Sequence, residues 1–297
     1  MIKYFDSITG FINGLSDLPV AEKVKIYEEN NKLISNFRGV KVDGKKIVGV
    51  VQKNYGLLQH KDFFQEVGKT LINLGLNSNN IQLVVSPNST LAHAYIIFND
   101  KKIDDDEQGI MYGIKLTNSY NKESSIRVDF YGFRIACSNQ MVLRNLLSSE
   151  KKIHTGLKET NVQKIVSEMV RNVISRQEAF QELINKVLPQ SFEWQAFETI
   201  FLSMLRDHKI GFIHASNILN KIGVTVIKKK DEKTKIINYT LINETGKEIR
   251  KWDLYNAFTD YISHNDLSYS ATQYLEKLSE RVLNMPTKVE QLIEGGE

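Results

Sequence analysis

One stretch of the sequence, FYGFRIACSNQMVLRNLL at residues 130–147, combines residue types that could perform covalent chemistry. It contains Cys137, the only cysteine of the chain, with Arg134 three residues before it and Asn139 two residues after it. The charge of Arg134, together with a helix that begins directly after the cysteine, would lower the pKa of the thiol. A nucleophile also needs a base, and no histidine lies nearby in the sequence. An enzyme hypothesis therefore requires Cys137, Asn139 and His154 to converge in one pocket.

The alternative is a structural cysteine, and the pattern favours it. A small residue between a β-rich run and the following helical pattern is typical of a buried strand-to-helix junction. Arg134 and Asn139 would then fix that junction or face a ligand. We therefore predict no catalytic residue. In the alternative enzyme hypothesis, Cys137 is the candidate for the reactive thiol.

Signatures of metal and cofactor binding are absent from the sequence. It contains no GxxxxGK[ST], GxGxxG or HExxH motif, and its six histidines lack the spacing of metal ligands. The acidic run from Asp104 to Glu107 is typical of a solvated turn. A single cysteine excludes an intrachain disulfide and a thiolate zinc cluster. We expect neither a metal nor a cofactor.

The composition is that of a globular protein. The 297 residues are 41% apolar and 25% charged, which is enough apolar material for a sizeable core. No 18-residue apolar run and no signal-peptide pattern occur, so we expect no membrane span and no membrane partner. With one cysteine, a reducing cytoplasm is the expected location, that of the host cell if the protein is viral.

Residues 1–148 read as a β-rich α+β domain. The Asp43-Gly44 pair lies between β-branched runs and predicts a hairpin. The segment HKDFFQEVGKTLINLG, residues 60–75, has helical spacing and ends at Gly75. Four β-rich runs follow, separated by turn residues. The pattern predicts a curved antiparallel sheet with one inserted helix.

Residues 149–297 read as a mainly helical domain. Apolar residues at helical spacing run from Val162 to Val187 and stop before Pro189. Further amphipathic segments flank VTVIKKKDEKTKIINYTLI, which predicts a basic-tipped β-hairpin. No Pro/Gly-rich linker divides the halves, so we expect the two domains to pack together in one α+β protein.

The charge distribution permits binding to a polyanion. The chain has a net charge of +4, and residues 151–250 carry 17 Lys and Arg against 11 Asp and Glu. The positive charge is densest at Lys228 to Lys235, which includes Lys228, Lys229 and Lys230. A lysine-rich hairpin tip is also typical of an ordinary solvated turn, so this run alone is weak evidence for nucleic-acid binding.

Four ordered blocks give the chain a family resemblance. The segments GVVQKNYGLLQHKDFFQEV, GIKLTNSYNKESSIRVDFYGFRIACSNQMVL, KIHTG and KWDLYNAFTDYISH follow one another between about residues 40 and 265. They resemble the phage/plasmid-like protein family, a domain of unknown function widespread in phages, archaeal viruses and plasmids. The resemblance implies that the protein originates from a mobile genetic element.

The family pattern maps onto individual positions of this sequence. The matching residues are Tyr55, Asn118, Ser119, Arg134, Cys137, Asn139, His154, Trp252, Asn256, Ala257 and Thr259. Two positions depart from it: Tyr120-Asn121 stands where the family often has His-Asp, and Ser263-His264 where it often has Asp-His. The departures favour binding over chemistry.

Our leading hypothesis is binding of nucleic acid, with single-stranded DNA favoured. A helix on antiparallel hairpins, followed by basic and helical material, is similar to Rad52-like annealing proteins by fold-level analogy. Such a protein, acting in recombination, would be expected to form a homo-oligomer. In this hypothesis cations meet phosphates and tyrosine rings stack on unpaired bases. The candidate residues are Lys46, Lys53, Arg127, Arg134, Tyr55, Tyr112, Tyr131, Lys228, Lys229 and Lys230.

Two alternatives stay open. One is a hydrolytic or nucleotide-processing enzyme that uses a pocket formed by Cys137, Asn139 and His154. The other is a counter-defence factor that binds a host protein. The candidate tyrosines and lysines also have a simpler interpretation, because tyrosine is frequent in strands and lysine keeps strand edges soluble.

Overall fold

The computed structural model describes residues 1–297 except 104–108, 135–138, 144–149, 155–158, 233 and 295–297. The chain divides into two compact units. Unit 1 contains residues 1–103, 109–133 and 142–179, and unit 2 contains residues 104–108, 134–141 and 180–297. We describe each unit by itself.

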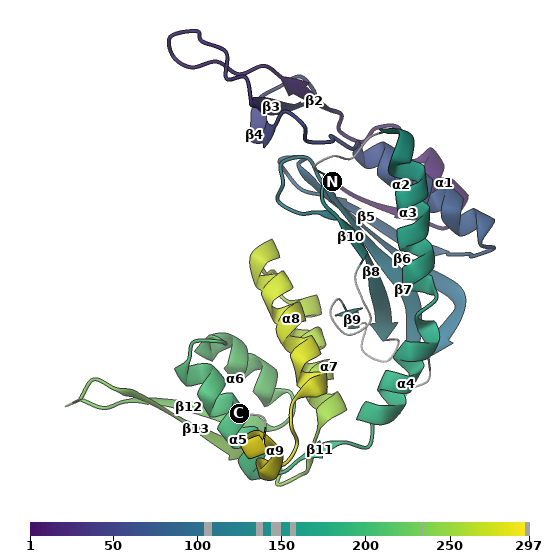
Figure 1. The fold of residues 1–297 in the computed structure, drawn as a ribbon. Coiled ribbons are helices and arrows are strands. Elements are labelled where there is room, and N and C mark those ends of the chain that lie inside the picture. Colours follow the sequence, from purple (N-terminus) through teal and green to yellow (C-terminus); the bar gives the residue numbers. More distant parts are fainter. Residues whose placement is uncertain (104–108, 135–138, 144–149, 155–158, 233, 295–297) are drawn as a thin grey trace. The chain divides into compact units, whose positions relative to one another are not determined.

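Unit 1 is built on a seven-stranded sheet (Figure 1). Across the sheet the strands are β1 (Ile2–Phe5), β5 (Asn80–Val85), β6 (Leu91–Ile103), β7 (Ile110–Ser119), β8 (Ile126–Arg134) and β10 (Glu150–Lys152). Strand β9 (Asn139–Leu143), whose first three residues are assigned to unit 2, also pairs with β8. Antiparallel pairing joins β1 to β5, β5 to β6, β6 to β7 and β8 to β10. The predicted antiparallel sheet is confirmed.

Helices α1 (Ile8–Asn13), α2 (His60–Asn73) and α3 (Glu159–Ile174) lie on one side of this sheet (Figure 1). Helix α2 buries Phe63, Phe64, Val67 and Leu71, the apolar stripe that its sequence spacing predicts. The chain leaves the helix through Gly75, whose φ of +68° suits glycine. The inserted helix is therefore confirmed.

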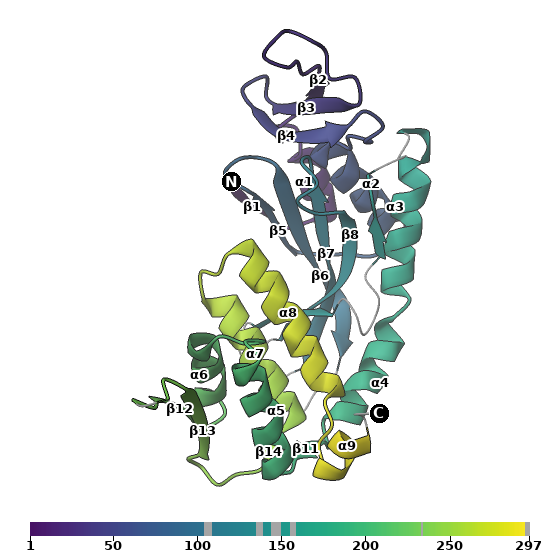
Figure 2. The ribbon, with the colours of Figure 1, turned by 60° about the vertical axis from the view of Figure 1, so that its left-hand side comes forward.

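A smaller antiparallel sheet belongs to the same unit (Figure 2). It consists of β2 (Ala21–Val24), β3 (Phe37–Val42) and β4 (Ile47–Gln52). The predicted Asp43-Gly44 turn connects β3 to β4, and both of its residues have positive φ. Its inner face contributes Ala21, Val40 and Val51 to a core that also contains Tyr55 and Tyr120.

Unit 2 is mainly helical, as its sequence predicts. Its elements are α4 (Gln177–Val187), which begins in unit 1, then β11 (Ser191–Phe192), α5 (Trp194–Arg206), α6 (Phe212–Asn220), β12 (Val224–Lys230), β13 (Ile237–Asn243), β14 (Ile249–Arg250), α7 (Lys251–His264), α8 (Tyr269–Asn284) and α9 (Val289–Glu294). Strands β12 and β13 form the predicted basic hairpin, and β11 pairs with β14. Helix α7 packs along α8.

The α+β class is confirmed, but unit 1 extends beyond residue 148. Helix α3 contributes to unit 1 because it packs on α2, where the hydroxyl oxygens of Thr70 and Ser167 are 2.9 Å apart. Cys137 itself lies outside the described residues, but residues 139–143 after it form strand β9, which pairs with β8. The prediction of a helix directly after the cysteine is therefore wrong. Among the helices that the structure describes, none is long and apolar enough to cross a membrane.

Candidate functional site

Three family-motif residues that are far apart in the sequence meet in unit 1. The ring of Tyr55, just after β4, stacks on the imidazole of His154 with centroids 4.8 Å apart. Its hydroxyl donates a hydrogen bond to the Ser119 carbonyl at 3.3 Å. His154 Nδ1 donates to the Gly56 carbonyl at 3.0 Å, since a carbonyl only accepts. The resemblance therefore identified residues that share one buried cluster.

A second layer of the cluster surrounds His60, the first residue of α2. Its ring stacks on Tyr120 with centroids 3.8 Å apart, and the Asn118 side-chain amide donates to its Nδ1 at 3.0 Å. The Tyr120 hydroxyl accepts from the His60 backbone N–H at 2.9 Å and donates to the Pro19 carbonyl at 2.8 Å. Gln59 pairs through its side-chain amide with both backbone groups of Ala21. These bonds fasten the small sheet to the large one.

Burial keeps both histidines of the cluster neutral. It lowers the pKa of His60 to about 3 and the pKa of His154 to about 4. Neither Nε2 has a hydrogen-bond partner among the described residues. A base with so low a pKa abstracts protons poorly at neutral pH. The cluster therefore supports a structural role, and Cys137, which the enzyme hypothesis requires, lies outside the described residues.

Removal of the Tyr120 hydroxyl tests this structural role. Tyr120→Phe leaves the buried His60 N–H and the Pro19 carbonyl without this partner, so we expect the free energy of unfolding to fall by about 2 kcal/mol. Hydrogen exchange should accelerate in residues 19–24. Tyr4→Phe, which alters an exposed hydroxyl, is the control and should change stability by less than about 0.5 kcal/mol. Equal effects of the two substitutions would contradict the role.

The outer face of the small sheet is apolar and exposed. Phe37, Ile47 and Val50 are 41%, 46% and 51% exposed. Gly39 lies beneath them, since an added Cβ there would be 3.0–3.1 Å from the side chains of Ile47, Ile26 and Val24. A sheet face of this kind is unusual for a surface that meets only water.

Basic residues are frequent in the segment that forms this face. Residues 21–54 contain eight Lys and Arg against four Asp and Glu, a local charge of +4 that equals that of the whole chain. Two of them bond to backbone carbonyls: Lys23 Nζ to Tyr55 O at 2.8 Å and Arg38 Nη1 to Phe37 O at 2.6 Å. Within the described ranges, no carboxylate lies within 4.0 Å of the other six, which are Lys25, Lys32, Lys41, Lys45, Lys46 and Lys53. We call these six lysines and the apolar outer residues the basic sheet face.

The structure separates the sequence-predicted residues into two groups. Lys46 and Lys53 are exposed on the basic sheet face, so a ligand can reach both ammonium groups. Tyr55, Tyr112 and Tyr131 are only 2%, 0% and 2% exposed, which corrects the expectation that their rings face a groove. Their aromatic surface is core material, and the Tyr112 hydroxyl bonds to carbonyls at the end of α3.

Arg127 of β8 is less available than expected. Arg127 is half-buried and its Nη2 is 3.3 Å from Oδ1 of the fully buried Asp129. An arginine committed to a buried carboxylate is a poor phosphate ligand, which corrects the expectation for this residue. The side chains of Arg134 and Asn139 lie outside the described part of the structure.

The hairpin of unit 2 forms a separate basic surface. Lys228, Lys229 and Lys230 are exposed on β12. Lys228 Nζ lies 5.5 Å from the centroid of the Phe212 ring, which stacks on Tyr239. The hairpin thus combines cations with aromatic rings.

The family motif on α7 is core rather than surface. Trp252, Asn256 and Thr259 share one helical face and are 0%, 7% and 2% exposed. On the same helix, burial and the carboxylates of Glu280 and Glu276 raise the pKa of Tyr255 well above its ordinary value. These positions stabilise unit 2.

Sequence reasoning missed Phe37. Residues 37–42 alternate, with Val40 and Val42 buried, so Phe37 falls on the opposite face of its strand. This alternation was the available signal for an exposed aromatic beside Lys53.

The described residues define an α+β protein with a basic, partly apolar sheet face. Residues 47–283 match the family model described as Domain of unknown function (DUF932), and the chain belongs to this family. Neither a curated protein nor a solved structure matches the chain.

Proposed function

We propose that this protein binds single-stranded nucleic acid, single-stranded DNA in the first instance, through the basic sheet face of unit 1. The observation that carries the proposal is an exposed aromatic and aliphatic sheet surface in a segment that contains six lysines, none of which pairs with a described carboxylate.

Each part of this face matches a part of a single strand. Unpaired bases stack on aromatic rings and cover apolar side chains, so Phe37, Ile47 and Val50 supply base contacts. Phosphates attract lysine ammonium groups and release counterions. A paired duplex hides its base faces, so this surface favours a single strand over a duplex.

We infer a DNA-annealing or recombination protein of a phage, virus or plasmid that works in the host cytoplasm as an oligomer. The support is the family resemblance and the analogy with Rad52-like proteins. The basic hairpin of unit 2 is a second candidate contact for the strand.

Fluorescence anisotropy tests the proposal with labelled single-stranded DNA, double-stranded DNA and single-stranded RNA at two salt concentrations. We expect tighter binding of single strands, and affinity that falls as salt rises. The RNA arm decides between the two kinds of single strand. Absence of binding at low salt would reject the proposal.

Truncation of Phe37 tests the base contact. Loss of one stacking ring costs about 1–3 kcal/mol per base, so Phe37→Ala should weaken single-strand binding by at least about fivefold at unchanged salt dependence. Tyr4→Ala removes an aromatic ring that is 72% exposed on β1 and is the matched control. Equal affinities of the two variants would show that Phe37 makes no base contact.

Binding of a host protein is the competing interpretation of the exposed apolar residues. A nuclease-treated pull-down separates the two. Capture of one specific host protein, lost in a Val50→Glu variant, together with no DNA binding would replace our proposal.

A further inference from the structure

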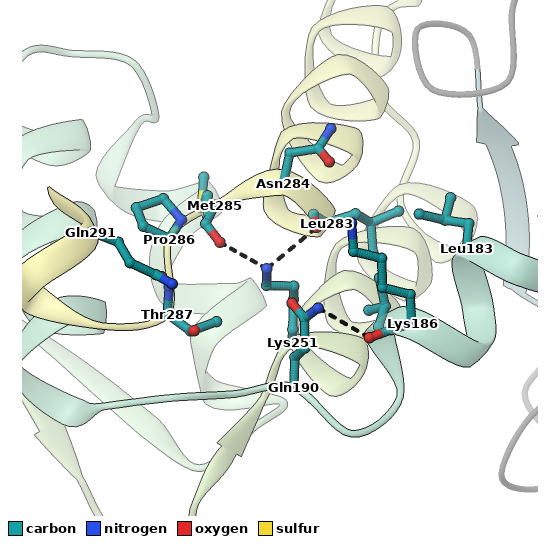
Figure 3. A pocket seen from close by; sticks show the side chains of 11 residues that line it. Leu183, Lys186, Gln190, Lys251, Leu283, Asn284, Met285, Pro286, Thr287 and Gln291 are labelled. Carbon is teal, nitrogen blue, oxygen red and sulfur yellow. Dashed lines mark hydrogen bonds between the residues drawn. The ribbon is translucent and has the colours of Figure 1, made fainter. Parts of the chain in front are cut away.

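Unit 2 contains a pocket that the proposed function does not use (Figure 3). Its volume is about 720 Å³, within the range of small-molecule sites. It is lined by the end of α4 and Gln190 after it, the first residue of α7, the end of α8, and the following segment as far as Gln291 in α9. All of these belong to unit 2.

A buried ammonium group faces this pocket. Lys251 is 4% exposed, and its Nζ donates hydrogen bonds to the carbonyls of Met285 at 2.7 Å and Leu283 at 3.3 Å (Figure 3). These acceptors are neutral, and in the described residues no carboxylate lies within 4.0 Å of this nitrogen. A buried charge without a counter-ion destabilises the fold.

A second cation lines the same pocket. Lys186, in the last turn of α4, belongs to the wall that includes Lys251. Burial, and secondarily the charge of Lys186, lower the pKa of Lys251 to about 8. Two ammonium groups at one cavity repel each other, and a bound anion would relieve both the repulsion and the missing counter-ion.

The remaining walls fit a small organic molecule. Gln190, Asn284 and Gln291 supply side-chain amides, while Leu183, Val187 and Met285 supply apolar surface. Apolar walls with a few polar groups are typical of small-molecule sites.

We propose that this pocket binds a small organic anion whose phosphate or carboxylate group contacts Lys186 and Lys251 and whose apolar body lies against the adjoining walls. The site is independent of the basic sheet face, because it belongs to the other unit.

Isothermal titration calorimetry of the full chain tests this site with three probes. Phenyl phosphate carries a phosphate group and benzoate carries a carboxylate group. Benzyl alcohol is the uncharged control. We expect at least one anion to bind at least tenfold more tightly than benzyl alcohol. Benzyl alcohol binding as tightly as both anions, or no binding of either anion, would overturn the proposal.

Substitutions locate the binding. Lys186→Met and Lys251→Met should each weaken anion binding at least tenfold, and Lys277→Met, on the exposed side of α8, should not. Lys251 also bonds to carbonyls at the end of α8, so Lys251→Met can impair folding. Lys186 is exposed and its side chain makes no such bond to the part of the chain that the structure describes, so Lys186→Met keeps the test decisive. Equal affinity of Lys186→Met and Lys277→Met would overturn the proposal.

Discussion

Replacement of Lys45, Lys46 and Lys53 by glutamate is expected to weaken single-stranded DNA binding by about 100- to 1000-fold at about 0.1 M salt. Each exposed charge contact contributes up to about 1 kcal/mol, and reversal adds repulsion to the lost attraction. The three lysines lie at both ends of β4, so the change affects the length of the basic sheet face. Loss of three phosphate contacts should also reduce the slope of log K against log salt by about 2.

The control must keep the same total charge. Lys151, Lys152 and Lys164 are exposed elsewhere in unit 1, and their replacement by glutamate changes the net charge by the same amount. If the basic sheet face is the binding surface, this control should lose less than about tenfold in affinity. Equal losses in the two variants would indicate non-specific attraction to a basic protein and contradict the assignment.

Local sequence signals predicted the elements because their causes are local. The stripe of Phe63, Val67 and Leu71 predicts α2, and the Asp43-Gly44 pair predicts the turn after β3. Apolar spacing alone did not predict that α3 completes unit 1, because its partner α2 lies about 100 residues earlier.

Tyrosine exposure could not be predicted from the sequence. All residues of β7 except Met111 are buried, so Tyr112 is in the core whichever face it occupies. A sequence pattern indicates a strand, but burial on both faces depends on what covers the strand. The exposed aromatic of the small sheet, Phe37, was predictable from alternation with Val40.

The convergence of the motif residues depends on topology. Tyr55, Ser119 and His154 meet only because the ends of β4 and β7 and the segment after β10 come together. The family resemblance grouped these residues without a physical reason. The structure supplies one, since they fasten the small sheet to the large one.

Acid should destabilise unit 1 through its two buried histidines. The folded pKa values of His60 and His154, about 3 and about 4, lie below the ordinary value of 6.5. At a pH between the folded pKa and the ordinary pKa of 6.5, each histidine binds more protons in the unfolded chain than in the folded chain. The free energy of unfolding therefore falls as the pH falls through this range. The penalty is absent well above pH 6.5, grows below it, and levels off below the folded pKa values. Each histidine should cost about 2 kcal/mol at pH 5.

Asparagine variants separate the acid destabilisation caused by the two histidines from that caused by protonation of carboxylates. His60→Asn and His154→Asn each place an amide near the hydrogen bond that Nδ1 makes, without a group that titrates in this range. Their unfolding free energies, measured with urea between pH 7.5 and 5, should fall by about 2 kcal/mol less per substitution than that of the unchanged chain. Hydrogen exchange in residues 55–65 and 112–120 assigns the difference to unit 1.

His264→Asn, at the exposed C-terminal residue of α7, is the control and should keep the original pH dependence. Parallel pH profiles for all four proteins would show that the buried histidines do not set the acid sensitivity.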